Sequence, residues 1–343
     1  MTTDLISFLI TAHNAERTLT TTISALQAQV VDQAFEIVIV DDRSSDRTHA
    51  LAHDLSATDT RIRVLRTSSV RPDVTARQAA LDLAVQTAKG SVLLLVDADA
   101  EPPTGWARRM VQALSHADLV ASALVFEPAT PRAWSWLALL QTADAAHYLG
   151  VCEVLGRLGL ASGVCFGAAG FRRSLYDAIG GFGALGCTLV EDLAFARAAH
   201  RHGARVRVLW DAPVAVRAVP TLRDLLERVR RVSTTGGPSL LAAALGLWGA
   251  SLLGLAVAAL VGALPVTWFV VRYAVGVLWT LTQTARVGAW RAWFVAPWYE
   301  GMTILIALAV LCTPARSRRV AWGGLQYVRR RGSWTRVSSI PVR

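Results

Sequence analysis

Three carboxylates stand close together at the end of an apolar segment in residues 91–103, whose sequence is SVLLLVDADAEPP. Asp97, Asp99 and Glu101 follow five consecutive apolar residues, a pattern typical of a strand buried on both faces of a parallel sheet. In open α/β sheets, ligands bind just beyond the carboxyl ends of the strands. Side chains two apart on an extended chain point the same way, so Asp97 and Asp99 are expected to face one ligand. The competing interpretation is a solvated strand end without function.

Further polar groups follow other apolar segments of the chain. The segments ITAHNAERTL (10–19) and VDDRSSDRT (40–48) each come directly after a run typical of a strand, and VEDLAFARAAHRHG (190–203) lies farther on. The carboxyl ends of parallel strands meet at one edge of a sheet. The polar groups that end the first, second and fourth expected strands, at 10–19, 40–48 and 97–101, are therefore expected to converge there. Convergence of several motifs arises by chance much less often than any one motif.

Strands and helices alternate along the first hundred residues. Strands are expected at 5–11, 36–42, 62–66 and 91–99, with helices at 16–29, 46–55 and 75–88 between them. The alternation predicts right-handed crossovers and an α/β fold, a mainly parallel sheet sandwiched by helices. The rest of a domain spanning 1–219 is expected to hold a helix at 106–114, a strand at 117–128, helices within 133–160, loops at 163–186, a helix at 189–202 and a strand at 204–214.

The composition restricts the class of protein. The 343 residues carry a formal net charge of +10, but the basic residues show neither the single stripe nor the interleaved aromatic residues of a nucleic-acid-binding face. No nucleic acid is therefore expected as a partner. Many arginines lie in the C-terminal third beside apolar segments, which fits anionic headgroups or phosphorylated substrates. The four cysteines lack C-x-x-C spacing, so structural zinc is not expected.

Beyond Pro220 the chain becomes first amphipathic and then apolar. Residues 220–236 place leucines and valines on one helical face and arginines opposite, as in a helix lying in a membrane interface, with an ordinary surface helix as the alternative. In a membrane region predicted at 237–313, two spans are expected at 239–264 and 266–284, and residues 293–312 form a third span or a re-entrant segment. A basic tail, 314–343, and the catalytic domain are expected in the cytoplasm, the protein being a multi-pass protein of the cell membrane.

These motifs, spread over about residues 5–235, resemble those of the family 2 glycosyltransferases, which are inverting enzymes with a GT-A fold that use nucleotide-diphosphate sugars. The resemblance implies a Rossmann-like GT-A domain, followed here by C-terminal membrane helices. It places the first loop against the nucleotide, one of two adjacent aspartates at the base and an arginine near the diphosphate. The residues at these positions are Thr11, His13 and Glu16 in the loop, Asp41 or Asp42 at the base, and Arg77.

The same resemblance assigns the acidic motifs and the acceptor side. Asp97 and Asp99 match the family's D-x-D motif, and Glu191 with Asp192 match the E-D pair whose aspartate is the general base. The acceptor-side loop corresponds to residues 167–172, with Gly170, Phe171 and Arg172. Residues 227–232, ERVRRV, stand where many membrane-bound members carry Q-x-x-R-W, and the missing tryptophan argues against a processive polysaccharide synthase. Arg228 and Arg231 in this stretch meet either the diphosphate or anionic lipid.

The chemistry that these residue types provide fits sugar transfer. A sugar diphosphate leaves with several negative charges, and Mg²⁺ or Mn²⁺ held by a few carboxylates and by phosphate oxygens neutralises them. Asp99 is the expected metal ligand, whereas Asp97 is expected to contact the ribose or a metal-bound water. Direct displacement also needs a base on the opposite face of the sugar, for which Asp192 is the candidate. Alternatively, Glu191 and Asp192 only favour the start of a helix.

The sequence thus predicts an inverting, metal-dependent glycosyltransferase associated with a membrane. It is expected to transfer one sugar from a nucleotide-diphosphate sugar, with a UDP-sugar favoured, to a hydroxyl of a lipid acceptor, forming a glycolipid. Two alternatives remain: a catalytically inactive membrane scaffold or transporter subunit that binds sugar nucleotides, and a nucleotidyltransferase. A scaffold needs no base, and a nucleotidyltransferase would usually carry a glycine-rich arginine loop after its first strand, which TAHNAERTL is not.

Overall fold

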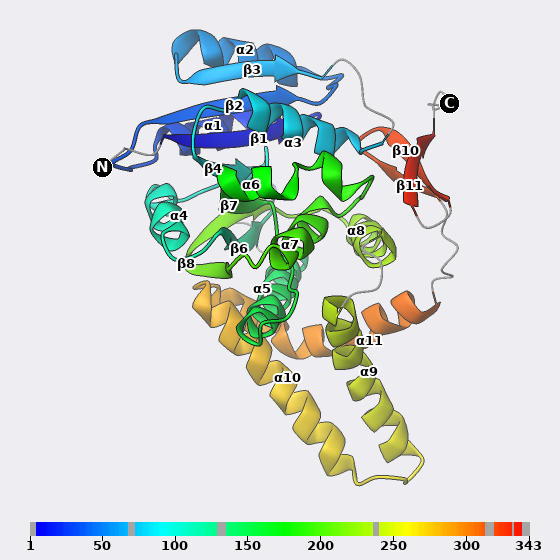
Figure 1. Ribbon diagram of the computed structural model, residues 1–343. Coiled ribbons are helices and arrows are strands. Elements are labelled where there is room, and N and C mark those ends of the chain that lie inside the picture. The colour runs from blue at the N-terminus through cyan, green and yellow to red at the C-terminus, as the bar shows by residue number, and fades with distance from the viewer. Residues whose placement is uncertain are drawn as a thin grey trace. The chain divides into compact units, whose positions relative to one another are not determined.

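The computed structural model describes residues 5–67, 73–128, 135–235, 240–312, 319–330 and 333–337 (Figure 1). The chain divides into two compact units. The first combines residues 1–122, 163–216 and 318–343, and the second combines residues 123–162 and 217–317. The C-terminal segment, treated as a tail in the sequence analysis, therefore belongs to the same unit as the predicted nucleotide-binding residues.

Four parallel strands form one half of an eight-stranded sheet of order β3-β2-β1-β4-β7-β6-β8-β5. They are β1 (Ile6–Ala12), β2 (Phe35–Asp41), β3 (Ile62–Arg66) and β4 (Val92–Val96). The helices between them are α1 (Leu19–Gln27), α2 (Thr48–Thr58) and α3 (Ala76–Thr87), of which α3 packs on β1 and β2. The predicted α/β alternation is thereby confirmed.

The other half of the sheet is mostly antiparallel. Its strands are β5 (Ala100–Glu101), β6 (Leu119–Glu127), β7 (Ala168–Arg172) and β8 (Val206–Arg217), with α4 (Trp106–Leu114), α6 (Arg173–Ile179), the short helix η1 (Gly183–Leu185) and α7 (Glu191–Arg201). Strand β7 lies between β4 and β6 and is antiparallel to both. The region 163–186, predicted to be loops, thus supplies a buried strand and a helix.

Burial of the parallel strands fixes where they end. Every residue of β4 is at most 2% exposed, in agreement with the apolar run that predicted it. The ring of Phe8 in β1 meets that of Phe35 edge-on, with 5.3 Å between the ring centroids, and stacks on that of Trp106, with 6.3 Å between the centroids. A slip of one residue would turn these side chains to the wrong face, so the register of the strands, and with it the position of the loops that follow them, is strongly specified.

A second, three-stranded antiparallel sheet lies near the C-terminus. It consists of β9 (Arg319–Trp322), β10 (Leu325–Arg330) and β11 (Ser333–Val337), and is called the C-terminal sheet below. Tyr327 is fully buried and Trp334 is 5% exposed, and both pack with Leu189, which precedes α7. This packing within the first unit was not expected from the sequence.

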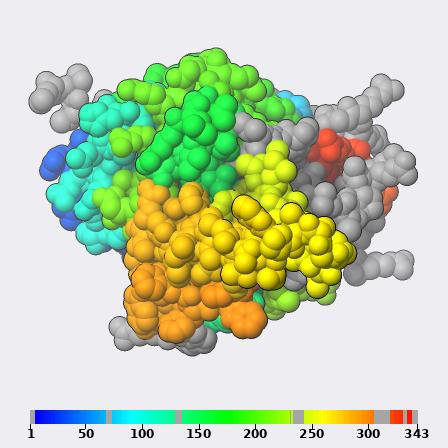
Figure 2. All heavy atoms as spheres, turned by 90° about the horizontal axis from the view of Figure 1, so that it is seen from below, coloured from blue at the N-terminus to red at the C-terminus, as the bar shows by residue number. Residues whose placement is uncertain are grey.

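The second unit is helical. Its helices are α5 (Trp136–Arg157), α8 (Leu222–Thr235), α9 (Leu240–Leu260), α10 (Val266–Arg286), the short helix η2 (Trp290–Val295) and α11 (Ala296–Cys312). Helices α9 and α10 form a long hairpin, whose surface Figure 2 shows in yellow and orange. The carboxylate of Glu300 accepts hydrogen bonds from Arg272 Nη1 at 3.2 Å and Trp248 Nε1 at 3.2 Å, and a Cβ atom at Gly276 would collide with it.

The prediction of a multi-pass membrane region is not supported. Among the described residues one helix, α9, is long and apolar enough to cross a membrane, over Ala243–Leu260, and 11% of that window is buried. The predicted span at 266–284 is α10, which carries Arg272, and α11 has 17 residues and carries Glu300. Counting apolar residues overlooked that these two charges pair with each other inside the unit.

Gly170 in the middle of β7 offers a test of the packing. A Cβ atom there would lie 2.5 Å from Leu94 Cδ2 and 3.0 Å from Met110 Cε, both in the buried core. Gly170→Ala is therefore expected to lower the free energy of unfolding by about 1–3 kcal/mol through overpacking. The control Gly105→Ala, where nothing lies within 4 Å, should cost at most about 1 kcal/mol, because it only replaces the N-cap glycine of α4. Equal effects in urea denaturation would contradict this view of the sheet.

Candidate active site

Arg77 connects two of the acidic motifs. It lies in the first turn of α3, and its Nε donates to Glu191 Oε1 at 2.6 Å while its Nη2 donates to Asp97 Oδ1 at 2.5 Å. Its side chain is 23% exposed, that of Asp97 30% and that of Glu191 7%. Burial alone would lower the pKa of Arg77. The attraction of Asp97 and Glu191 is stronger than this effect and raises the pKa above its ordinary value. The D-x-D and E-D motifs, 94 positions apart from Asp97 to Glu191, therefore meet at one arginine.

A capping box starts α3 and thereby places Arg77. Thr75 Oγ1 accepts the N–H of Gln78 at 3.2 Å, and Gln78 Oε1 accepts the N–H of Thr75 at 3.0 Å. The amide of Gln78 also donates to the carbonyl oxygens of Phe182 and Gly186, and its Oε1 accepts the N–H of Thr188. This fully buried side chain thus holds the loop that leads to Glu191. Gln78 was not among the residues predicted from the sequence, although T-x-x-Q before an apolar stretch is a capping-box signal.

Asp97 and Asp99 lie in a turn rather than on an extended strand. The N–H of Asp97 donates to Gly167 O at 3.1 Å, and the carbonyl oxygen of Asp97 accepts the N–H of Ala100 at 3.1 Å. The argument from alternating side chains therefore does not apply to this pair, because β4 ends at Val96. Both side chains are partly exposed, and the turn sets them at the end of β4, where the sequence analysis expected a ligand.

The two residues of the E-D pair have different surroundings. Glu191 is 5% exposed and its carboxylate is bound by Arg77. Asp192 is partly exposed in the first turn of α7, and its Oδ1 accepts the N–H of Leu193 at 2.7 Å. Glu191 thus has a structural role in this site, whereas Asp192 keeps contact with solvent. The bond to Leu193 also agrees with the view that acidic residues favour a helix start.

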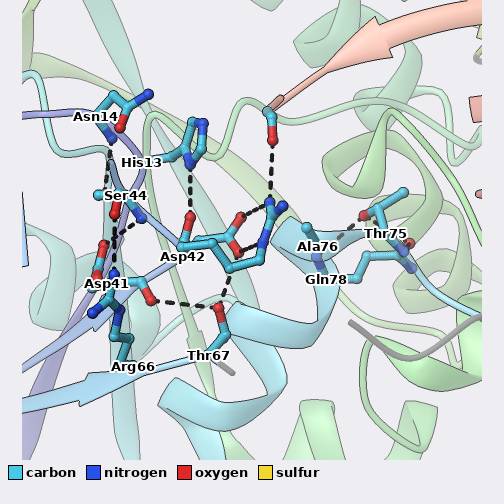
Figure 3. A network of polar contacts seen from close by, with 12 residues as sticks. His13, Asn14, Asp41, Asp42, Ser44, Arg66, Thr67, Thr75, Ala76 and Gln78 are labelled. Carbon is cyan, nitrogen blue, oxygen red and sulfur yellow. Dashed lines mark hydrogen bonds and ion pairs between the residues drawn. The ribbon is translucent and has the colours of Figure 1, made fainter. Parts of the chain in front are cut away.

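The loops after β1 and β2 form one polar network (Figure 3). Asp41 is fully buried, and its carboxylate accepts the N–H of Ser44 at 3.0 Å and pairs with Arg66 Nε at 3.0 Å. The carbonyl oxygen of Asp42 lies 2.6 Å from His13 Nδ1, and the N–H of Asn14 donates to Ser44 Oγ at 3.0 Å. Asp41 therefore organises the turn, while Asp42 and His13 lie together at its edge.

Arg43 belongs to the same network and was missed by the sequence analysis. Its Nε and Nη2 donate to the two carboxylate oxygens of Asp42 at 2.8 and 3.2 Å. Its φ of 58° lies in the left-handed region, which a non-glycine residue adopts at an energetic cost that is often met at functional sites. Thr67 Oγ1 adds a third hydrogen bond to Asp42, at 3.1 Å from Oδ1.

Two other members of the predicted set take peripheral positions. Thr11 is the penultimate residue of β1, beside Val40 in the register with β2. Glu16 is exposed, and its Oε2 accepts the N–H of Arg47 at 3.2 Å, which joins the first loop to the second.

Within the first unit, Gly170, Phe171 and Arg172 of the predicted acceptor-side loop do not lie at this edge of the sheet. Because β7 runs antiparallel to β4, Arg172 lies beside Val92 at the start of β4, and Ala168 lies beside Val96 at its end. Gly170 and Phe171 are buried between these ends, Phe171 in a cluster with Phe166, Phe182 and Phe195. The part of the motif next to Asp97 is Gly167. Arg228 and Arg231 lie on α8 in the second unit, where the guanidinium of Arg228 stands over the ring of Phe126 at 5.0 Å.

The carboxylates at the site are donors suited to a hard cation. Among the described residues no group of three or more His, Cys, Asp or Glu side chains could hold a metal by themselves. Mg²⁺ and Mn²⁺ commonly bind through one or two carboxylates and complete their shell with water and phosphate oxygens. The turn at Asp97 and Asp99 fits this kind of site, in which the substrate supplies further ligands.

Comparison with known proteins identifies the family. Residues 7–180 match the model of glycosyl transferase family 2, so the chain belongs to that family and is a glycosyltransferase. No curated protein matches the chain in sequence.

Several solved structures are similar to the chain. A mannosyltransferase from Pyrobaculum calidifontis, PcManGT, in complex with GDP-Man and Mn²⁺, is 19% identical with a TM-score of 0.55, covering 90% of this chain and 87% of that one. GalNAc-T7 with UDP, GalNAc and Mn²⁺ is 18% identical with a TM-score of 0.48, and the match covers 67% of this chain and 48% of GalNAc-T7. TarS of S. aureus in complex with UDP is 15% identical with a TM-score of 0.45, and the match covers 96% of this chain and 98% of that TarS chain. The likeness to the mannosyltransferase supports a GT-A-like fold.

Arg77→Ala tests how strongly the two motifs depend on their shared arginine. It removes the counter-charge between Asp97 and Glu191 and is expected to lower the free energy of unfolding by about 1–3 kcal/mol, less than for a fully buried pair because Arg77 and Asp97 are partly exposed. Arg109→Ala, which breaks the exposed pair with Asp211, should cost less than about 0.5 kcal/mol. A loss no larger than in this control, measured by urea denaturation, would show that Arg77 is not central.

Proposed function

We propose that this protein transfers a single sugar, with inversion, from a nucleotide-diphosphate sugar to a hydroxyl group of a lipid at a membrane surface. The observation that carries the proposal is the ion triad of Arg77, Asp97 and Glu191. It places the turn of the D-x-D motif beside the start of α7, where Asp192 stands. The proposed donor site and the candidate base thus belong to one unit.

The nucleotide is proposed to lie along the edge formed by the first two loops and the start of α3. Asp41 and Asp42 are both buried, at 0% and 6% exposed, and both carboxylates are already bound, Asp41 by Ser44 and Arg66 and Asp42 by Arg43 and Thr67. Asp42 is the favoured candidate for the base because it lies beside His13 at the edge of the network. His13 lies beside Asp42, and Thr11 and Glu16 support this loop. Arg77 is proposed to lie near the diphosphate, but Asp97 and Glu191 already outweigh its single positive charge, so the cation proposed at Asp99 must supply the neutralising charge. A uridine nucleotide is the favoured donor, with guanosine as the alternative to be compared.

Asp99 is proposed to hold Mg²⁺ or Mn²⁺ together with oxygens of the diphosphate, while Asp97 stays bound to Arg77 and contacts the ribose or a water. A cation bound there would neutralise the charge that develops on the leaving diphosphate. Asp192 takes the proton from the acceptor hydroxyl as its oxygen attacks the anomeric carbon. The bond from that carbon to the diphosphate oxygen breaks on the opposite face, so the configuration inverts and the nucleoside diphosphate leaves with the electron pair.

The lipid acceptor is proposed from the surface of the second unit. The α9–α10 hairpin exposes large apolar side chains, among them Leu260 at 86%, Val261 at 72% and Trp268 at 59%. Such a concentration is unusual on a surface that faces only water. Helix α8, with Leu222 and Leu226 exposed and several arginines, has the amphipathic character of an interfacial helix. These features support association with a bilayer, from which an amphiphilic acceptor would present its hydroxyl.

Two variants separate donor binding from chemistry. With Mn²⁺ present, UDP or GDP should raise the melting temperature of the wild type, and EDTA should abolish the effect. A nucleotide that binds only the folded protein raises the free energy of unfolding by about 2.7 kcal/mol when its concentration is a hundred times its dissociation constant. Asp99→Asn should lose this stabilisation. Asp192→Asn should keep it but lose transfer to extracted lipids by roughly 10²–10⁴-fold.

The matched control for both variants is Asp211→Asn, because Asp211 is an exposed carboxylate whose ion pair lies elsewhere in the first unit. It should bind and transfer like the wild type. If Asp192→Asn transferred sugar at the wild-type rate, Asp192 would not be the general base. A wild type that no nucleotide stabilises with any metal would remove the donor site.

Membrane binding can be tested at the tip of the hairpin. Replacing both Leu260 and Val261 with Asp should weaken sedimentation with anionic liposomes more than about tenfold, since each buried aliphatic side chain contributes about 1.5–3 kcal/mol. Val30→Asp changes a single exposed valine of the first unit, 63% exposed, and should leave binding unchanged. Circular dichroism checks that all variants fold. Undiminished binding of the double variant would show that the hairpin tip does not contact the bilayer.

A further inference from the structure

The C-terminal sheet contacts the loops that carry the proposed nucleotide site. Its β10 residue Tyr327 is fully buried, and its hydroxyl accepts the N–H of Ala76 at 3.2 Å. Ala76 is the first residue of α3 and precedes Arg77. The ring of Tyr327 packs on Leu189, two positions before Glu191. One side chain of this sheet thus contacts two of the three segments that meet at the ion triad, the start of α3 and the segment leading to α7.

The turn between β9 and β10 lies against the loops after β1 and β2. Gly323 and Gly324 have φ values of 55° and 72°, which two successive glycines adopt without strain in a tight hairpin. The carbonyl oxygen of Gly323 accepts a hydrogen bond from Arg43 Nη2 at 3.1 Å. A Cβ atom at Gly324 would lie 3.6 Å from Nε2 of His13, so the turn approaches this ring directly.

Arg43 therefore joins the sheet to the aspartate proposed to hold the base. The same guanidinium that binds Gly323 O donates twice to the carboxylate of Asp42. The backbone of Arg43 is in the left-handed region, with a φ of 58°, which differs from the conformation of a residue in a helix or a strand. Figure 3 shows Asp42 and His13 on one side and Ala76 on the other, with a strand of the C-terminal sheet, in faint red, above them.

We propose that the C-terminal sheet forms the base side of the donor site, with the Gly323–Gly324 turn closing it over His13 and Arg43 coupling it to Asp42. This inference rests on the donor site proposed above and adds an element to it. If the nucleotide binds only while the sheet is docked, then binding must stabilise docking to the same extent, because the coupling between the two equilibria is reciprocal. Inorganic pyrophosphate, which has no base, should not show this coupling.

Hydrogen exchange with mass spectrometry on the full-length protein measures the coupling. At saturating UDP with Mn²⁺, or GDP if that nucleotide binds more tightly, amides of residues 319–330 should exchange about tenfold or more slowly. Pyrophosphate with Mn²⁺ should leave them unchanged. Peptides from 240–260 in the second unit serve as the internal control and should not respond.

Arg43→Ala tests the coupling residue, and Arg61→Ala is its control because Arg61 forms an ion pair with Asp59 elsewhere in the same unit. Arg43→Ala should lose most of the protection that the nucleotide gives to residues 319–330, whereas Arg61→Ala should keep it. An arginine that only stabilises the fold would change exchange equally with and without nucleotide.

The outcomes separate this inference from the proposed function. Protection of residues 10–16 and 40–48 without protection of 319–330 would overturn the role of the sheet and leave the donor site intact. Faster exchange of 319–330 on binding would mean that the sheet competes with the nucleotide, and equal protection by pyrophosphate would place it at the diphosphate; either result overturns the proposal. No protection anywhere would overturn the donor site and this inference together.

Discussion

The first unit depends on one positive charge placed between two negative ones. Without Arg77, the carboxylates of Asp97 and Glu191 would face each other in a partly buried space, where like charges repel strongly. With it, the end of β4 and the start of α7 are held to the start of α3. The position of Asp192 near the end of β4 follows from this contact, because Asp192 is the next residue after Glu191.

The arginine is in place because hydrogen bonds fix the start of its helix, those of Thr75, Ala76 and Gln78. Gln78, one residue after Arg77, completes a capping box and satisfies backbone groups of the loop that leads to Glu191. Leaving even one such buried group without a partner costs about 1–3 kcal/mol, so the loop has little freedom to move away from α3. Tyr327 adds a contact to the same helix start from the other end of the chain. Local hydrogen bonding thus translates into the geometry of the site.

Much of this architecture could be predicted from the sequence, and the failures have physical causes. The runs that became β1 and β2 are mostly apolar and that of β4 is wholly apolar, so they identify buried parallel strands, and their polar ends do meet at one edge. Strand β7 is rich in alanine and glycine and resembles a loop, so its direction, and therefore the location of Phe171 and Arg172, was not accessible. The arginines around the C-terminal sheet suggested a tail, although Tyr327 and Trp334 bury their rings against Leu189. Residues Gln78 and Arg43 act through partners distant in sequence, which no local pattern shows.

Binding of metal and diphosphate at the turn that follows β4 is the central requirement of the proposed function. Anomalous diffraction from crystals grown with Mn²⁺ and the nucleoside diphosphate that binds best tests this directly. We predict one manganese peak bound by the Asp99 carboxylate and by diphosphate oxygens, with Arg77 still between Asp97 and Glu191. A manganese peak and a diphosphate located away from this turn, with Asp99 contacting neither, would contradict the account.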